Sequence, residues 1–447
     1  MNDRPSEWDK YLLGSVLFLA LMIGGGTASG LYSDTLIQIA AIVSAAAVFS
    51  QTSGPRTVHS GLWLLILAVG LGVLQIVPLP AAIFNGLRPE LLLGGPWVGE
   101  NRFRFISVGV GRTVECLLYL VGAAAFFLAV LRLRVEQVNA LLPFFFMGVL
   151  CNGLAGAIQY SLSDSIAIVG LLPFTINAGL FANVNHFSAL LFVSIPFLVY
   201  YGLFRGHLLS GSIGLIVLLL LLLAAGSRAG VLIGLAITVL SVVFLSAHSR
   251  SGGLSVLLIF VGLSVYTIGA WTKIDAEVID PAFGRGEFAR TTIDGIKDNW
   301  PTGVGFGNFQ KAYQIYESKS MIFDKYVNHA HNDYLEVAFE GGVIAVLLMI
   351  AYFCLLLNRL IEVRRDPFQK AAFLSVSFLL IHSLVDYPLR TEALAMTFAY
   401  MNAIIFHKGF AERLSRKSEV IEIDHNGDKL FVPVEASRMS AATDASV

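Results

Sequence analysis

The chain has 447 residues, of which 56% are hydrophobic and 14% are charged, and its mean hydropathy is +0.74. Soluble proteins carry charge on about a quarter of their residues. The composition therefore excludes an ordinary soluble enzyme and predicts an all-α polytopic membrane protein. The net charge of −1 gives no electrostatic reason to expect a nucleic-acid partner.

Apolar runs of roughly 20 residues are long enough to cross a bilayer as helices. The first run has no clear cleavage site of small residues, so we expect a retained span rather than a signal peptide. The pattern is weakest at 34–50 and 209–247. About twelve transmembrane helices are predicted, at 11–26, 34–50, 61–77, 113–131, 138–160, 186–204, 209–225, 229–247, 254–271, 335–357, 369–386 and 392–407.

Basic residues in the short loops indicate the orientation of the spans. With the N-terminus inside, every short cytoplasmic loop carries arginine or lysine, and the long loops reach the opposite face, where charge matters little. The predicted organisation is a cytoplasmic N-terminus at 1–10, helices 1–9 within 11–271, a large periplasmic loop at 272–333, helices 10–12 within 334–407 and a cytoplasmic tail at 408–447.

The segment 272–333 is too long and too rich in aromatic residues to be a passive linker. We expect a short amphipathic helix from Thr292 to Trp300 and a turn-rich glycine loop from Pro301 to Phe309. In the tail, residues 419–434 alternate apolar and polar side chains around Asn426-Gly427, which predicts a β-hairpin.

Residues 328–336, with the sequence NHAHNDYLE, mark the end of this polar segment and the start of an apolar run. Asp333 and Glu336 have the spacing of a capping box, so Asp333 is the predicted N-cap of a helix running to about Leu357. His331 and Asn332 then lie just before a helix N-terminus, where amide donors and the helix dipole favour a phosphate or diphosphate. A histidine there can accept a proton near neutral pH.

His331 is therefore the first candidate for chemistry, and His329 and Asn332 are its supporting neighbours. The alternative is a histidine that only forms local hydrogen bonds at the start of a helix. A metal pair of His329 and His331 has no third ligand of matching spacing in the sequence. We expect neither a metal nor another cofactor.

Three arginines are candidate anion ligands. Arg228 lies between two strongly apolar runs, on the side opposite the basic short loops. It is either an interfacial anchor or a bidentate phosphate ligand, with Gly226 and Gly230 leaving room for a headgroup. Arg285 and Arg290 are diphosphate-binding candidates in the large loop, or solvated loop charges.

Polar residues also lie at the outer ends of other spans. Asn183 and His186 stand at the start of one, where asparagine either caps the helix or contributes to the site. Asp386 stands at the end of another. A carboxylate in that position is costly unless it is paired, and an arginine or His331 is the expected partner.

Taken together, these residues resemble the O-antigen ligase and polysaccharide polymerase superfamily of bacterial membrane glycosyltransferases. The resemblance rests mainly on residues 328–336, which follow a large loop and precede FEGG at 339–342. Weaker matches are QIVPLP at 75–80, FANVNH at 181–186, SRAG at 227–230, PTGVGFGNF at 301–309 and DYP at 386–388.

The resemblance implies a fold like that of the C-type glycosyltransferases, in a multi-pass protein of the bacterial inner membrane. It implies a glycan donor on undecaprenyl diphosphate and an acceptor glycolipid, glycan or protein, joined at the periplasmic face with inversion and without metal. His331 would be the catalytic histidine and Arg228 would bind the diphosphate. A second arginine would be Arg285 or Arg290, and the spacing to Pro301 slightly favours Arg285.

Three functions remain open at this stage. A ligase and a polymerase share the donor chemistry, in which arginines stabilise the leaving diphosphate and His331 deprotonates a sugar hydroxyl. A transporter of lipid-linked sugars or solutes would carry charges within its spans. The spans here are nearly free of charge and the polar candidates gather at one surface, which favours catalysis.

Overall fold

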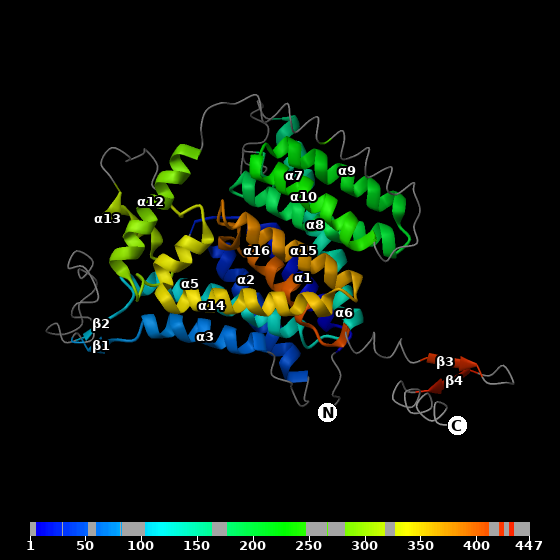
Figure 1. Ribbon diagram of the computed structural model, residues 1–447, viewed down its shortest axis with the longest axis horizontal. Helices are drawn as coiled ribbons and strands as arrows, with labels where there is room; N and C mark the ends of the chain where they lie inside the picture. The colour runs from blue at the N-terminus through cyan, green and yellow to red at the C-terminus, as the bar shows by residue number, and fades with distance from the viewer. Residues whose placement is uncertain are drawn as a thin grey trace, which may run out of the picture.

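The computed structural model of the protein is mostly helical (Figure 1). It describes residues 6–28, 30–51, 60–80, 82, 103–162, 177–246, 266, 282–317, 327–410, 420–423 and 429–432. The helices are α1 (Asp9–Ile23), α2 (Tyr32–Gln51), α3 (Ser60–Gln75), α5 (Val110–Val130), α6 (Val135–Asn139), α7 (Leu142–Ser161), α8 (Val184–Phe204), α9 (Leu208–Ala225), α10 (Arg228–Ser246), α12 (Ala282–Asn299), α13 (Phe309–Tyr316), α14 (Asp333–Val363), α15 (Pro367–His382), the 3-10 helix η4 (Pro388–Arg390) and α16 (Glu392–Phe406).

These helices make the chain a multi-pass membrane protein. Among the described residues, seven helices are long and apolar enough to cross a bilayer, and two shorter apolar helices accompany them. Every predicted span except 254–271 contains a helix, and 138–160 is divided between α6 and α7. The span 254–271 lies, apart from Tyr266, outside the described residues, so the count of twelve stays a prediction.

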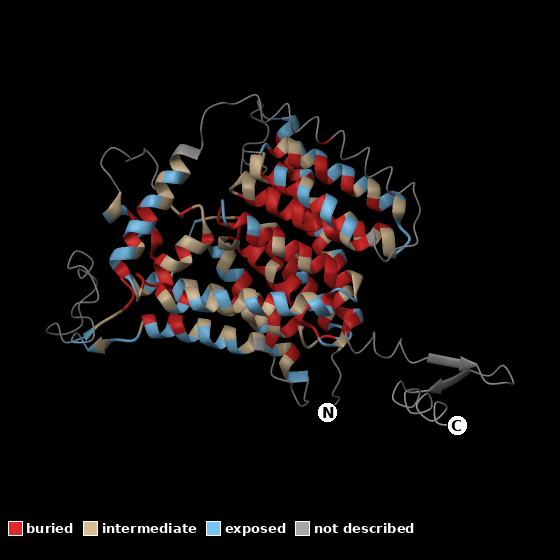
Figure 2. Ribbon diagram, viewed as in Figure 1, coloured by how far each residue is buried: buried red, intermediate tan, exposed pale blue. Residues whose placement is uncertain are grey.

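The buried core is centred on α8, α15 and α16 in the middle of the bundle (Figure 2), with α1 packed against α16 and further helices contributing buried side chains. In α8, every side chain from His186 to Phe197 is buried. A helix that is apolar all round belongs in such a position. The outer helices instead leave large apolar side chains exposed, such as Leu347, Leu357 and Ile361 on α14, and these surfaces suit surrounding hydrocarbon.

At one end of the bundle, α12 and α13 form a layer over the start of α14 (Figure 1). The amphipathic helix expected from Thr292 to Trp300 is longer than predicted, because α12 begins at Ala282. Phe288, in its first half, packs against a small second core that includes Phe309 and Phe339. This packing offsets the low helix propensity of the glycines at the start of α12.

The glycine loop 301–308 joins this layer to α14. Helix α14 is interrupted at Gly342, whose φ is 61° and ψ is −153°. The carbonyls of Phe339 and Glu340 accept hydrogen bonds from the amides of Val304 and Gly305 at 3.0 and 2.8 Å. The loop therefore satisfies the backbone groups that the interruption of the helix leaves without partners.

Gln75, at the end of α3, fixes the same junction from a second direction. Its side chain accepts a hydrogen bond from the Phe306 amide at 2.9 Å and donates one to the Glu340 carbonyl at 3.1 Å. The QIVPLP segment thus has a structural role. It leads into β1 (Leu79–Pro80), which pairs antiparallel with β2 (Phe103–Arg104).

The C-terminal hairpin forms as the sequence indicates. Strand β3 (Val420–Ile423) pairs antiparallel with β4 (Lys429–Val432), with Val420 opposite Val432. The Asn426-Gly427 turn lies outside the described residues.

Candidate active site

The segment 328–332 carries the two histidines of the motif into the end of the bundle. The carboxylate of Glu336, one turn into α14, accepts a hydrogen bond from the Ala330 amide at 2.9 Å and contacts Nδ1 of His329 at 2.8 Å. His331 has a φ of 51°, the one positive value among the described residues other than glycine. Such strained backbone at a bulky residue is typical of functional sites.

The N-cap of α14 is Asn332, which corrects the predicted Asp333. The Asn332 side chain accepts hydrogen bonds from the amides of Tyr334 and Leu335, both at 3.0 Å. Asp333 instead begins the helix and accepts a hydrogen bond from the Ser383 hydroxyl at 2.8 Å. The capping-box spacing was misleading because the carboxylates of Asp333 and Glu336 are both used in tertiary contacts.

Asp386 contacts residues from three other segments of the chain. One of its oxygens lies 3.4 Å from Nδ1 of His331 and 3.8 Å from Nε2 of His186. The other lies 3.7 Å from the Arg285 guanidinium and accepts a hydrogen bond from the Asn185 side chain. Asp386 is buried, and these partners favour its ionised form. Both predicted partners, an arginine and His331, are present.

Aromatic rings fix the orientation of the imidazoles. The Tyr387 ring lies 4.7 Å from the ring of His186, 4.3 Å from that of His329 and 4.9 Å from that of His331, measured between centroids. On another side, Phe288 of α12 stacks on His331 at 5.7 Å. Tyr387 thus contacts the rings of both His329 and His331, although these histidines interact with different carboxylates.

The arginine candidates differ in their positions. Arg285 is half-buried beside Asp386, whereas Arg290 is exposed, so the geometry favours Arg285. Arg228 begins α10 directly after Ser227, whose hydroxyl donates to the Asn185 side chain at 2.7 Å. Arg228 is thereby placed next to the network around Asp386.

Among the residues predicted near the starts of α8 and α10, Asn183 and Gly226 have the expected surroundings and Gly230 does not. Asn183 is the N-cap of α8 and accepts a hydrogen bond from the Asn185 amide at 2.8 Å, in agreement with the capping interpretation. Gly226 has open space around its α-carbon, as expected. Gly230 does not, because a Cβ there would lie 2.5 Å from the Ser188 side chain. Gly230 therefore serves helix packing rather than a headgroup.

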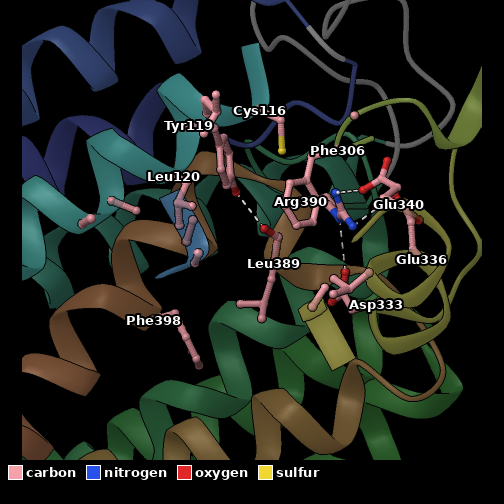
Figure 3. Close-up of a pocket in the computed structure, with 18 of the residues that line it drawn as sticks. Cys116, Tyr119, Leu120, Phe306, Asp333, Glu336, Glu340, Leu389, Arg390 and Phe398 are labelled. Atoms are coloured by element: carbon pink, nitrogen blue, oxygen red, sulfur yellow. Dashed lines mark hydrogen bonds and ion pairs between the residues drawn. The ribbon is translucent and has the colours of Figure 1, made fainter. Parts of the chain in front are cut away.

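Arg390 is the residue that the sequence analysis missed. It is located in η4, and its guanidinium lies 3.6 Å from Asp333, 3.5 Å from Glu336 and 3.2 Å from Glu340 (Figure 3). Their spacing of three and four residues puts the three carboxylates on one face of α14. Glu340 also accepts a hydrogen bond from the Phe309 amide at 3.0 Å. Arg390 therefore stabilises the layer that carries the histidines.

A cavity of about 880 Å³ lies beside this arginine. Its polar end includes His329, Asp333, Glu336, Glu340 and Arg390, as Figure 3 shows for the last four. Most of the rest is lined by apolar side chains of α2, α3, α5, α14 and α16, with polar side chains among them at Asp34, Gln38, Arg112, Glu115 and Asn402. His331, Asp386 and Arg285 do not line it. The end of the bundle therefore has two sides, one around Asp386 and one around Arg390.

In the described part of the chain, no group of three or more histidine, cysteine, aspartate or glutamate side chains is arranged to hold a metal ion. What the site offers is an imidazole in contact with a buried carboxylate, guanidinium groups nearby and a helix N-terminus. These groups suit proton transfer and the binding of an anion.

Comparison with known proteins links part of the chain to a known family. No curated protein matches the chain. A family model described as O-antigen ligase matches residues 213–350, about a third of the chain. The matched part includes Arg228, Arg285 and the whole 328–336 segment. The match therefore confirms the resemblance of this chain to the O-antigen ligase superfamily.

Proposed function

We propose that the protein is an inverting glycosyltransferase of the O-antigen ligase type, acting at the periplasmic face of a bacterial inner membrane. The donor is a glycan on undecaprenyl diphosphate, and the acceptor is a hydroxyl group of a glycolipid, glycan or protein. The family match supports a ligase or polymerase in general. The observation that carries the finer proposal is the contact between His331 and Asp386, with Arg285 beside them.

The geometry suits a single displacement. Asp386 faces Nδ1 of His331, so Nε2 is the nitrogen left to take the proton of the acceptor hydroxyl. The hydroxyl oxygen attacks the anomeric carbon as the bond from that carbon to the diphosphate oxygen breaks. Attack from the face opposite the leaving group inverts the configuration.

The leaving diphosphate gains negative charge, which Arg285 and Arg228 stabilise with the N-terminus of α14. No residue forms a covalent intermediate in this scheme. The arginines bind and orient the donor, and His331 moves the proton.

The test is transfer by purified protein from undecaprenyl diphosphate-linked glycan, with and without an acceptor, in wild type and His331→Ala. We expect His331→Ala to lower turnover by roughly 10²- to 10⁴-fold, with an unchanged elution profile in size-exclusion chromatography. Normal turnover of the well-folded variant would refute the proposed role of His331.

A polymerase is the second candidate, because the donor side is the same. The products distinguish the two functions. Histidine-dependent transfer onto lipid A core or protein indicates a ligase, whereas a ladder of glycan built on the lipid carrier indicates a polymerase. Transport is disfavoured because the charged candidates gather at one end of the bundle.

A further inference from the structure

Helix α12 contacts both members of the pair formed by His331 and Asp386. The guanidinium of Arg285 lies 3.7 Å from a carboxylate oxygen of Asp386. The ring of Phe288 stacks on the imidazole of His331, with the centroids 5.7 Å apart and an angle of 25° between the planes. Residues three apart on a helix lie on the same face. One turn of α12 therefore brings a cation to the carboxylate and an aromatic ring to the imidazole.

The contact with Asp386 does not by itself fix the imidazole of His331. The Nδ1 atom of His331 lies 3.4 Å from Asp386, whereas a charge-assisted hydrogen bond between nitrogen and oxygen is about 2.7–2.9 Å long. This nitrogen is buried and has no hydrogen-bond partner among the residues that the structure describes. The orientation of the imidazole therefore depends on its other contacts.

Two aromatic rings supply such contacts. Tyr387 meets the imidazole of His331 nearly edge-on, at 4.9 Å and 76°, and Phe288 covers it nearly face to face. Tyr387 is 4% exposed and its amide donates a hydrogen bond to Asp386 at 2.9 Å, so this ring is fixed together with the carboxylate. Phe288 belongs to the layer of α12 and α13, where its ring lies 6.4 Å from that of Tyr313. Of the two rings, Phe288 is thus the one whose place is set by α12.

Arg285 links the position of α12 to the donor. In the proposed mechanism its guanidinium binds the donor diphosphate, and charge-assisted hydrogen bonds of this kind are strong. Arg285 and Phe288 are separated by less than one helical turn, and a rigid helix carries a shift of one side chain to the other. A diphosphate held at Arg285 therefore also affects how Phe288 lies on His331.

We propose that Phe288 is a positioning residue whose ring holds the imidazole of His331 toward Asp386, and that binding of the donor diphosphate at Arg285 seats this ring. The proposal rests on the proposed function and deepens it, because it makes proton transfer by His331 depend on the presence of the leaving group. Phe288 acts through His331 and exchanges no proton, since a phenyl ring has no titratable group.

The first test measures the accessibility of His331 without turnover. The full-length protein in lipid nanodiscs is treated with diethyl pyrocarbonate, which acylates accessible imidazoles, and modified residues are identified by peptide mass spectrometry with the exposed His207 as reference. Phe288→Leu should react at His331 about tenfold faster than wild type, through the loss of one aromatic pair. Phe288→Tyr keeps the ring and should react as wild type does.

Ile296→Ala is the matched control. Ile296 packs against the same small core as Phe288 and lies about two turns further along α12. Its truncation loosens the same layer, and we expect labelling of His331 to stay at the wild-type rate. Equal acceleration in Ile296→Ala and Phe288→Leu would mean that the layer only covers the site, and would overturn the positioning role of Phe288.

Kinetics separate positioning from a loss of folded protein. Phe288→Leu should lower kcat about tenfold, equivalent to about 1.4 kcal/mol, and leave the KM for the donor unchanged, because Arg285 still binds the diphosphate. Phe288→Tyr should restore kcat. A higher KM at unchanged kcat, or a Phe288→Tyr variant as slow as Phe288→Leu, would overturn the proposal.

Inorganic diphosphate tests the coupling to the donor. It should slow the labelling of His331 in wild type but not in Phe288→Leu, because the seated ring protects the imidazole. Equal protection in both proteins would mean that diphosphate covers His331 directly, and the absence of protection in wild type would mean that Arg285 does not control Phe288. Either result would overturn the coupling. The labelling needs no glycosyl transfer, so an inactive wild type would count against the proposed function alone.

Discussion

Asp386, rather than His331, connects the residues of the candidate site. It contacts His331, Arg285 and the α8 pair of Asn185 and His186, which come from three separate segments of the chain. In the proposed mechanism, its carboxylate, 3.4 Å from Nδ1 of His331, would stabilise the imidazolium that forms when the acceptor hydroxyl is deprotonated. Mutation of Asp386 should therefore act through His331.

This dependence gives a prediction about two mutations. Asp386→Asn should lower kcat by roughly 10²-fold or more, and the Asp386→Asn/His331→Ala double variant should be no slower than His331→Ala alone, because the two residues act as a unit. The measurement is the rate of transfer by purified variants. Additive losses would indicate that Asp386 acts independently, for instance by folding the site.

The arginines are predicted to need their planar guanidinium groups. Arg228→Lys and Arg285→Lys should each lower kcat by roughly 10²-fold, because a point charge does not reproduce bidentate contacts with a diphosphate. Arg290→Lys should have little effect, given its exposure. The control is Arg205→Lys, which follows the end of α8. Full activity of Arg228→Lys would make Arg228 an interfacial anchor.

His329 gives a prediction about pH. Burial alone would lower the pKa of His329, but the facing Glu336 carboxylate raises it above its ordinary value. Its protonated form therefore stabilises the fold fully below the unfolded-state pKa of about 6.5, and this contribution is lost as the pH rises through the folded-state pKa.

The difference in melting temperature between wild type and His329→Gln should accordingly be largest in mildly acidic buffer and shrink in alkaline buffer. Differential scanning fluorimetry across this pH range measures it. A control is His207→Gln. His207 stacks on the uncharged ring of Tyr201 at 4.5 Å, a contact that involves no carboxylate. A difference that stays constant with pH would mean that the His329–Glu336 contact contributes no charge-dependent stability.

At the scale of elements, the junction between the glycine loop and α14 is the part most sensitive to added volume. Gly303 has a φ of 70°, and a Cβ there would lie 2.5 Å from the Glu340 carbonyl oxygen. Gly303→Ala should therefore destabilise the protein by more than about 1 kcal/mol. Gly286→Ala is the matched control: Gly286 lies in α12 with open space around it, and alanine there should be neutral or stabilising.

Thermal unfolding of both variants in one detergent measures this prediction. Equal melting temperatures for Gly303→Ala and wild type would show that the loop does not need to approach α14 so closely.

The sequence predicted elements well where a local pattern determines them. Apolar runs indicate helices, and the Asn-Gly hairpin signal is equally local. The start of α12 and the interruption of α14 at Gly342 were not predictable in this way, because contacts with distant segments stabilise both. The N-cap of α14 was wrong for the same reason, since Ser383 and Arg390, far along the chain, engage Asp333.

The residues of the candidate site also divide into those that a local sequence pattern indicates and those that depend on contacts between distant segments. His331 and Asp386 were proposed from the sequence because polar residues at the ends of apolar runs are conspicuous. Arg285 was proposed as one of two loop arginines that the family resemblance suggests, and in the structure it lies beside Asp386. Arg390 was missed because a single arginine between two spans looks like a loop charge. Only the fold shows that three carboxylates, the nearest 50 residues away along the chain, face it.

At the scale of the whole molecule, the bundle separates an apolar body from a polar end. The proposed catalysis without a metal fits this arrangement, because guanidinium groups and a helix N-terminus would stabilise the leaving group. EDTA should therefore leave transfer by the purified protein unchanged, measured as the initial rate before and after exhaustive dialysis. Inhibition that a divalent ion reverses would contradict this prediction.

The left-handed backbone at His331 also has a consequence for the length of the chain around it. In an extended strand, side chains two residues apart point to the same face, yet His329 and His331 contact different carboxylates, Glu336 and Asp386. The spacing of these histidines therefore determines whether His329 reaches Glu336 while His331 reaches Asp386. One inserted residue between them would move one imidazole away from its carboxylate without changing any side chain, so the contacts depend on the number of residues in 328–332.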